Sequence, residues 1–190
     1  MQSTSIKKSL LIPLIALAAN NASADGIRNF GDYMQIINPI VAAGFASQEK
    51  GVGHFAIIYA QNAIVVNGTK YIANKNKLSA SRRPNKSNPK SKYDGMPSGH
   101  TNAAWMAASY IRTFHKDNPY LSIPFYATAA ITGYSRVHAK KHTTAQVIAG
   151  AAIAEMLNFI NSEMDWSKNY QPTSFYIGGN EVSASFEIKF

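Results

Sequence analysis

The chain has 190 residues, a formal net charge of +9 and no cysteine. This length allows one domain with a substantial core, and the lack of thiols excludes disulfides and cysteine-based catalysis. The excess of basic residues favours anionic partners, namely phosphates, anionic lipids or nucleic acid.

The N-terminal segment has the form of a secretory leader. Two lysines precede an apolar run over residues 9–19, and Ala-Ser-Ala at residues 22–24 fits a small-residue cleavage site. We expect a signal peptide over residues 1–24 and a mature chain that begins at Asp25. The apolar run is short for a bilayer span, and a retained anchor is the alternative. A periplasmic location would make nucleic acid the least favoured partner.

Helical patterns follow the leader. Residues 25–30 are expected to be an extended lead-in, and Asp32 is a candidate cap of a first helix, which Pro39 bends or restarts. A second helix is predicted from His54 to about Asn74, because its apolar residues recur at helical spacing. His54 is expected to be a partnered residue at the helix start rather than a ligand.

Three further helices are predicted after a basic loop. Ser98 can cap the third helix, and Pro119 suits the first turn of the fourth. Thr143 and Gln146 match a capping box at the start of the fifth helix. His115, in the last turn of the third helix, is expected to be solvated and to interact with the carbonyl end of that helix.

The pattern changes after Trp166. Apolar and polar residues alternate over residues 182–190, after a Gly-Gly-Asn turn, which predicts a β hairpin packed on the helices as an appendage over residues 166–190. No mature segment offers about eighteen uninterrupted apolar residues. The predicted fold is therefore mainly α, a bundle of five to six helices over residues 25–165 with a short C-terminal β hairpin, in a soluble or peripheral protein.

A basic run lies directly before a short Ser-Gly-His motif. Residues 70–92 hold eight basic and no acidic side chains, and residues 97–100 read Pro-Ser-Gly-His. Phosphate chemistry without a metal requires fixed cationic donors, for which arginine is best suited, and backbone amides at a helix start. Arg83 and Arg136 are the candidate donors. His100 and His142 can act as nucleophile or proton donor near neutral pH.

The motifs resemble those of the type 2 phosphatidic acid phosphatase superfamily, which includes bacterial acid phosphatases and shares its site with vanadium haloperoxidases. Arg83-Pro84, the Pro-Ser-Gly-His of residues 97–100, and Ser135-Arg136 followed by five residues and His142 occur in the family's order. The resemblance covers about residues 30–160. It implies a helical bundle of the acid phosphatase and haloperoxidase type.

The resemblance implies a role for each matched position. His142 would be the nucleophile that forms a phosphohistidine, and His100 would protonate the leaving oxygen and then activate water. The phosphoryl oxygens would be held by Arg83, Arg136, Ser98 and the Gly99 amide. No metal or other cofactor is implied.

Two positions depart from the family pattern. The family places a lysine seven residues before Arg83, where this chain has Asn76; of the two flanking lysines, Lys77 is the favoured substitute. The family also places an acid four residues after the nucleophile, where this chain has Gln146. Its carbonyl oxygen could accept the ring N–H of His142, a role expected to compete with the capping box.

The sequence thus predicts an exported, metal-independent phosphatase that hydrolyses phosphate monoesters or pyrophosphates. A phosphorylated lipid head group is the favoured substrate class, such as lipid A, an isoprenyl pyrophosphate or a phosphatidylglycerol phosphate, with peripheral membrane contact. The alternatives are a nonspecific soluble acid phosphatase and a relative that binds phosphate or anionic lipid without turnover. Haloperoxidase activity, which requires vanadate, is the least favoured alternative.

Overall fold

The computed structural model describes residues 24–47, 50–84, 92–163, 170–178 and 181–188. Most of these residues lie in five α-helices: α2 (Ala24–Ala46), α3 (Val52–Lys75), α4 (Gly99–Phe114), α5 (Ser122–His138) and α6 (Thr144–Glu163). Two short 3₁₀ turns, η1 (Ser79–Ser81) and η3 (Pro119–Leu121), precede α4 and α5. The predicted mainly α bundle is confirmed.

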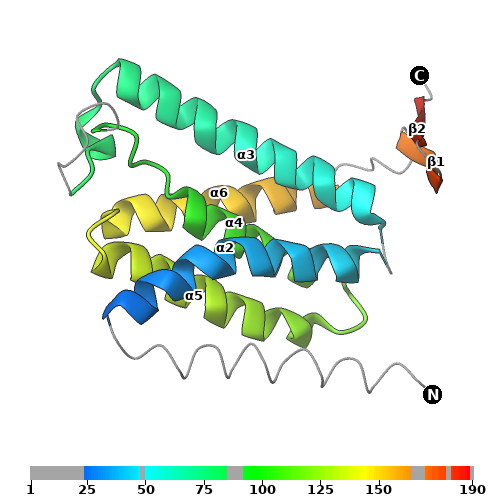
Figure 1. The fold of residues 1–190 in the computed structure, drawn as a ribbon, viewed down its shortest axis with the longest axis horizontal. Helices are drawn as coiled ribbons and strands as arrows, with labels where there is room; N and C mark the ends of the chain where they lie inside the picture. The colour runs from blue at the N-terminus through cyan, green and yellow to red at the C-terminus, as the bar shows by residue number, and fades with distance from the viewer. Residues whose placement is uncertain (1–23, 48–49, 85–91, 164–169, 179–180, 189–190) are drawn as a thin grey trace.

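Helix α4 is the central element of the bundle, in contact with each of the other four helices (Figure 1). Its sequence explains this position, because alanines alternate with larger apolar residues on every side of the helix. Ala104, Met106, Ala107 and Ile111 are completely buried. Small side chains allow neighbouring helices to approach closely, so α4 can be covered on all sides.

The closest approach is between α6 and the start of α4. A Cβ atom on Gly150 would lie 2.5 Å from the carbonyl oxygen of Ser98, which no side chain could tolerate without a backbone shift. The Ser98 amide also donates to the carbonyl oxygen of Gln146 at 2.8 Å. The first turn of α4 is therefore fixed directly to the first turns of α6.

Helix α2 corrects the prediction for the N-terminal part of the mature chain. The predicted extended lead-in over residues 25–30 is helical, and Asp32 lies inside the helix rather than at its cap. Phe30 and Met34 are buried one turn apart, so core packing extends the helix toward its N-terminus. Pro39 lies within α2 and does not end it.

Two histidines outside the matched motifs, His54 and His115, pack against aromatic side chains of the bundle. His54 Nδ1 lies 3.0 Å from the hydroxyl oxygen of Tyr110, which confirms the prediction of a partnered residue near a helix start. His115 is 6% exposed and its ring packs edge-on against Phe45, with centroids 5.8 Å apart. The prediction of a solvated His115 is wrong, because the end of α4 is covered by the aromatic side chains of α2.

The two ends of the chain carry predictions that stay open. The predicted signal peptide falls largely on residues 1–23, outside the described residues. Strands β1 (Tyr170–Gly178) and β2 (Glu181–Ile188) pair antiparallel. The side chains of these strands are outside the described part, so the predicted hairpin packed on the helices remains a prediction. Among the described residues, no helix combines the length and apolar character needed to cross a membrane.

Candidate active site

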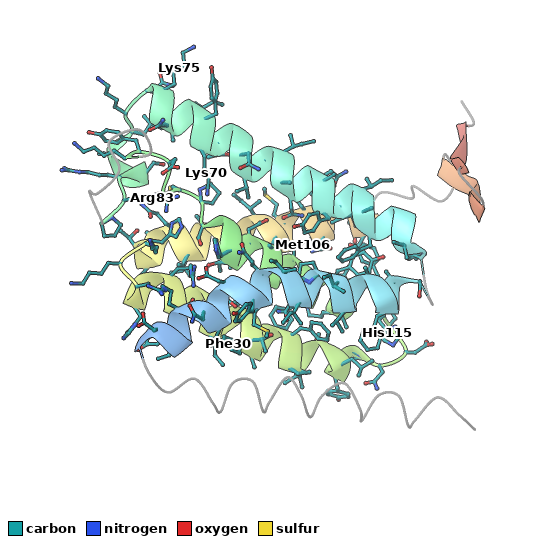
Figure 2. The ribbon with its side chains drawn as sticks, in the orientation of Figure 1. Phe30, Lys70, Lys75, Arg83, Met106 and His115 are labelled. Atoms are coloured by element: carbon teal, nitrogen blue, oxygen red, sulfur yellow. The ribbon has the colours of Figure 1, made fainter. Side chains whose placement is uncertain are left out.

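The matched motifs gather at one end of the bundle, where α3 and α5 finish and α4 and α6 begin. Figure 2 shows Lys70 and Arg83 at this end, while His115 lies at the opposite end. The site is thus built from segments more than one hundred residues apart in the sequence. Helix ends supply its backbone donors and acceptors.

His142 lies just before α6 and is buried, with 4% exposure. Its Nδ1 atom lies 2.8 Å from the carbonyl oxygen of Gly95 and 3.3 Å from Oε1 of Gln146. Both neighbours are acceptors, so Nδ1 carries the hydrogen in the neutral ring. Nε2 therefore keeps its lone pair, which is the form that a nucleophilic histidine requires.

The Gln146 side chain makes more contacts than the sequence suggests. Its Oε1 atom accepts from His142 and from the Thr143 amide, at 3.3 and 3.2 Å, and Thr143 Oγ1 accepts from the Gln146 amide, which confirms the capping box. The two predicted roles do not compete, because one amide oxygen has two lone pairs. Its Nε2 atom donates to the carbonyl oxygens of Ala80 and Arg82, at 3.0 and 2.9 Å.

These contacts explain why an amide rather than a carboxylate occupies this position. A carboxylate could accept from His142, but it could not donate to the two carbonyl oxygens before Arg83. Gly95 fits against the same side chain, since a Cβ atom there would lie 2.6 Å from Oε1 of Gln146. Gln146 therefore joins His142 to the loop that carries Arg83.

Arg83 is held by a carboxylate that the sequence reading did not single out. Its Nε atom donates to Oδ1 of Asp94 at 2.5 Å, and its amide donates to the Lys92 carbonyl at 2.9 Å. The Arg83 side chain is about one quarter exposed. Its Nη1 atom donates to the carbonyl oxygen of Lys141 at 3.4 Å. Arg83 is thus oriented by two acceptors, and its remaining N–H groups can bind an oxyanion.

His100 and Arg136 meet at Asp32, another residue that sequence reasoning missed as a site residue. Oδ1 of Asp32 lies 3.0 Å from Nε2 of His100 and 2.6 Å from Nη1 of Arg136. Arg136 is 3% exposed, and its Nη2 atom donates to the Arg28 carbonyl at 2.5 Å. In the sequence, an acid at this position is also typical of a helix cap, which is the role predicted for Asp32 above.

The structure brings Lys70 rather than Lys77 to the histidines. A Cβ atom on Gly99 would lie 3.5 Å from Nζ of Lys70, so the ammonium group lies beside the first turn of α4. Burial and the nearby Arg83 charge lower the pKa of Lys70, although Asp94 opposes them. Lys77 is exposed just after the end of α3. Lys70 does not fit the family spacing, because it lies six residues before Asn76, the position at which the family has its lysine.

Ser98 and Gly99 form the start of α4. Ser98 is completely buried, and its side chain accepts from the Thr101 amide, which confirms the predicted cap. Its Oγ atom also accepts from the Thr101 hydroxyl at 3.0 Å. Gly99 is partly exposed and lines the same cavity as His100 and Lys70. The Gly99 amide is therefore the better placed of the two predicted phosphate donors.

Both histidines are poor proton acceptors in this setting. Burial, with the Arg83 and Lys70 charges, lowers the pKa of His142 to about 4. Burial and the Arg136 charge lower the pKa of His100 to about 4, while Asp32 acts in the opposite direction. Both rings are consequently neutral at pH 7. A bound phosphate group would bring negative charge and raise both pKa values.

Comparisons with known proteins identify the family of the chain. The family model described as the PAP2 superfamily matches residues 51–169. A lipid A 4'-phosphatase of Helicobacter pylori is 32% identical over 93 residues, which cover 49% of this chain and 43% of that protein. The chain therefore matches less than half the length of that relative.

A solved structure was also found. The crystal structure of a transmembrane PAP2 type phosphatidylglycerolphosphate phosphatase from Bacillus subtilis has a TM-score of 0.49 and 19% identity. The similarity covers 87% of this chain and 89% of that chain.

The contacts of Gln146 predict the effect of an added charge. Gln146→Glu should lower the free energy of unfolding by about 2 kcal/mol at pH 8, because a buried carboxylate would face the Ala80 and Arg82 carbonyl oxygens without a donor. The deficit should shrink toward pH 5, where a protonated Glu can donate once. Urea unfolding at both pH values measures this.

Gln61→Glu is the matched control for this experiment. Oε1 of Gln61 accepts from Asn161 at 2.7 Å, and a carboxylate can accept in the same way. The control should therefore change stability little. Equal stability of Gln146→Glu and the parent at pH 8 would show that the described amide orientation is wrong.

Proposed function

The chain belongs to the PAP2 superfamily, and on that premise we propose that it is a metal-independent phosphatase with a histidine nucleophile. The observation that carries this proposal is the state of His142, whose Nδ1 atom is held by two acceptors beside Arg83 and Lys70. Nε2 is thereby left as the nucleophilic nitrogen. A neutral imidazole close to two cationic side chains is suited to attack on a phosphate ester.

In the first half-reaction, Nε2 of His142 attacks phosphorus while the bond from phosphorus to the leaving oxygen breaks. His100 supplies the proton that the leaving oxygen takes up. Because Asp32 holds Nε2 of His100, Nδ1 is the ring nitrogen assigned to this proton transfer. The products are a phosphohistidine and a neutral alcohol, or a phosphate when the substrate is a pyrophosphate.

In the second half-reaction, the neutral His100 ring removes a proton from water as the water oxygen attacks phosphorus. The bond between phosphorus and Nε2 of His142 then breaks, and phosphate is released. Asp32 stabilises the His100 imidazolium that this step creates. The family pattern places a carboxylate beside the nucleophile, at the position of Gln146. In this chain the carboxylate of Asp32 lies instead beside the proposed acid, His100.

Cationic groups hold the phosphoryl oxygens in this proposal. Arg83 and Lys70 are assigned to direct contact, together with the Gly99 amide at the start of α4. Arg136 is assigned to electrostatic support from behind Asp32, because its guanidinium is buried against α2. Lys70 takes the place that the sequence reading gave to Lys77.

A phosphorylated lipid is the proposed substrate class. The curated relative is named for lipid A, and several helices of this chain expose large apolar side chains. Helix α5 has no charged residue between Ser122 and Ser135, and it exposes Ile123, Ile131 and Tyr134. Exposed apolar surface of this kind marks contact sites for partners or membranes. Peripheral membrane contact and export through the predicted leader are part of this proposal.

Phosphate release tests the proposal directly. The mature chain should hydrolyse p-nitrophenyl phosphate with EDTA present, and His142→Ala should abolish release because the nucleophile is missing. A faster reaction with a phospholipid in vesicles than with the soluble ester would support the lipid assignment. The reverse order would indicate a soluble acid phosphatase, and bound phosphate without turnover would indicate a binding protein.

The pH dependence of kcat/KM should be bell-shaped, with its maximum between pH 4 and about 6. Below a pKa of about 4, His142 becomes protonated and loses its lone pair. His100, with a similar pKa, is neutral above that value. The proton that His100 passes to the leaving oxygen must then arrive with the monoanionic substrate, whose second pKa is about 6. A maximum above pH 8, or a monotonic profile, would contradict the two-histidine assignment.

Paired lysine variants test the revised phosphate contact. Lys70→Met should lower kcat/KM by about 10²–10³, by analogy with the loss of one oxyanion donor. Lys77→Met removes the same charge from an exposed position and should stay within about threefold of the parent. Circular dichroism would verify that both variants fold. The opposite ranking of the two variants would restore Lys77 as the phosphate ligand.

A further inference from the structure

A cavity of about 210 Å³ lies beside the proposed acid, between α2, α3 and α4. One end is formed by His100, Gly99 and Lys70, and the other end is reached at Tyr59 and Met106. Neither His142 nor Arg83 lines it. The cavity thus extends from the candidate site along the α3 side of the bundle, away from the nucleophile.

This placement matters for the direction of the reaction. The attacking and leaving atoms lie roughly in line on opposite sides of phosphorus during phosphoryl transfer. With His142 on one side of the phosphoryl group, the leaving group must lie on the side of His100. The cavity is the space that the structure offers there.

The walls of the cavity combine apolar surface with side-chain amides. Gln35, Asn62, Asn67 and Asn102 line it alongside Ala63, Val66 and Met106. Asn62 and Asn102 are buried and bonded to each other at 2.9 Å, so they fix α3 to α4. Gln35 and Asn67 are more accessible, and each spends one amide hydrogen on its own helix, on Asp32 O and Ala63 O.

Each of these two accessible amides retains a second N–H and a carbonyl oxygen. Such a pair can both donate to and accept from hydroxyl groups. A purely hydrocarbon occupant would remove these amides from water without replacing their hydrogen bonds, which is unfavourable. The lining therefore favours a ligand that alternates hydroxyl groups with carbon surface.

The volume limits the occupant further. Pockets that enclose a drug-sized ligand measure about 300–1,000 Å³, so this cavity can hold one sugar ring or a polyol but not a whole acylated lipid. Acyl chains would have to lie outside it. The exposed apolar side chains of Tyr59, which lines the cavity, and of Ile36, which follows the lining residue Gln35, are compatible with such a path.

We propose that this cavity is the leaving-group subsite and that it selects a hydroxylated leaving group, a sugar or a polyol, over an isoprenyl chain. Gln35 and Asn67 are the residues that form hydrogen bonds with the hydroxyl groups. The inference rests on the proposed phosphatase function and adds the chemical class of the alcohol that is released.

The test compares kcat/KM for four esters in one detergent: a hexosamine phosphate, glycerol 3-phosphate, farnesyl phosphate and p-nitrophenyl phosphate. The parent should prefer at least one hydroxylated ester over farnesyl phosphate by about 10-fold. The hexosamine and glycerol esters separate a sugar from a smaller polyol as the preferred ligand. Preference for farnesyl phosphate would overturn the inference while leaving the phosphatase function intact.

Three variants then locate the selectivity. Gln35→Met and Asn67→Leu should each lower the kcat/KM for the preferred hydroxylated ester, relative to that for p-nitrophenyl phosphate, by about 10-fold. Thr69→Leu, an exposed polar residue of α3 outside the cavity lining, is the matched control and should not change this ratio. An unchanged ratio in both cavity variants would overturn the assignment. Absence of release from all four esters would instead reject the phosphatase function, and the subsite with it.

Discussion

The site depends on the single amide of Gln146. Its oxygen accepts from the His142 ring and from the first amide of the capping box, while its nitrogen donates to two carbonyl oxygens of the loop before Arg83. The His142 ring, the start of α6 and the loop before Arg83 are therefore held by one buried group whose hydrogen-bonding capacity is fully used. The His142 ring is oriented here through neutral hydrogen bonds, and the carboxylate on this side of the site, Asp94, binds Arg83.

A second carboxylate, Asp32, reaches the other side of the site from α2. Asp32 contacts both His100 and Arg136, and it can do so because α2 is one continuous helix that passes across the ends of α4 and α5. Gly31 permits this crossing, since a Cβ atom there would meet the Ser135 and Arg136 side chains. The bundle thus distributes its charges asymmetrically: cations surround His142, whereas His100 has a carboxylate and a guanidinium within reach.

The sequence predicted the elements that depend on local signals. The helix caps at Ser98 and Thr143 and the mainly α fold follow from residue types and short spacings. Asp32 and Lys70 could not be predicted in this way, because their roles depend on which helix faces cross at the site, and that is decided by long-range packing. Asp32 fits the pattern of a helix cap in the sequence. It lies inside α2 instead, because the buried face of the helix begins before it, at Phe30. Lys70 was overlooked because it lies two helical turns before the spacing that the family uses.

The contact between Gly150 and Ser98 separates the part of the bundle that carries the two histidines from the helices that line the rest of the cavity. It joins the first turns of α4 and α6 into one rigid platform, to which both histidines are attached. This platform contains no residue of α2 or α3, which form the remaining walls of the cavity beside His100. Substitutions on those two helices that spare Asp32 and Lys70 can therefore reshape the cavity without changing the placement of His142 relative to His100. A scaffold built in this way can acquire new substrates by mutation of its walls while its catalytic platform stays unchanged.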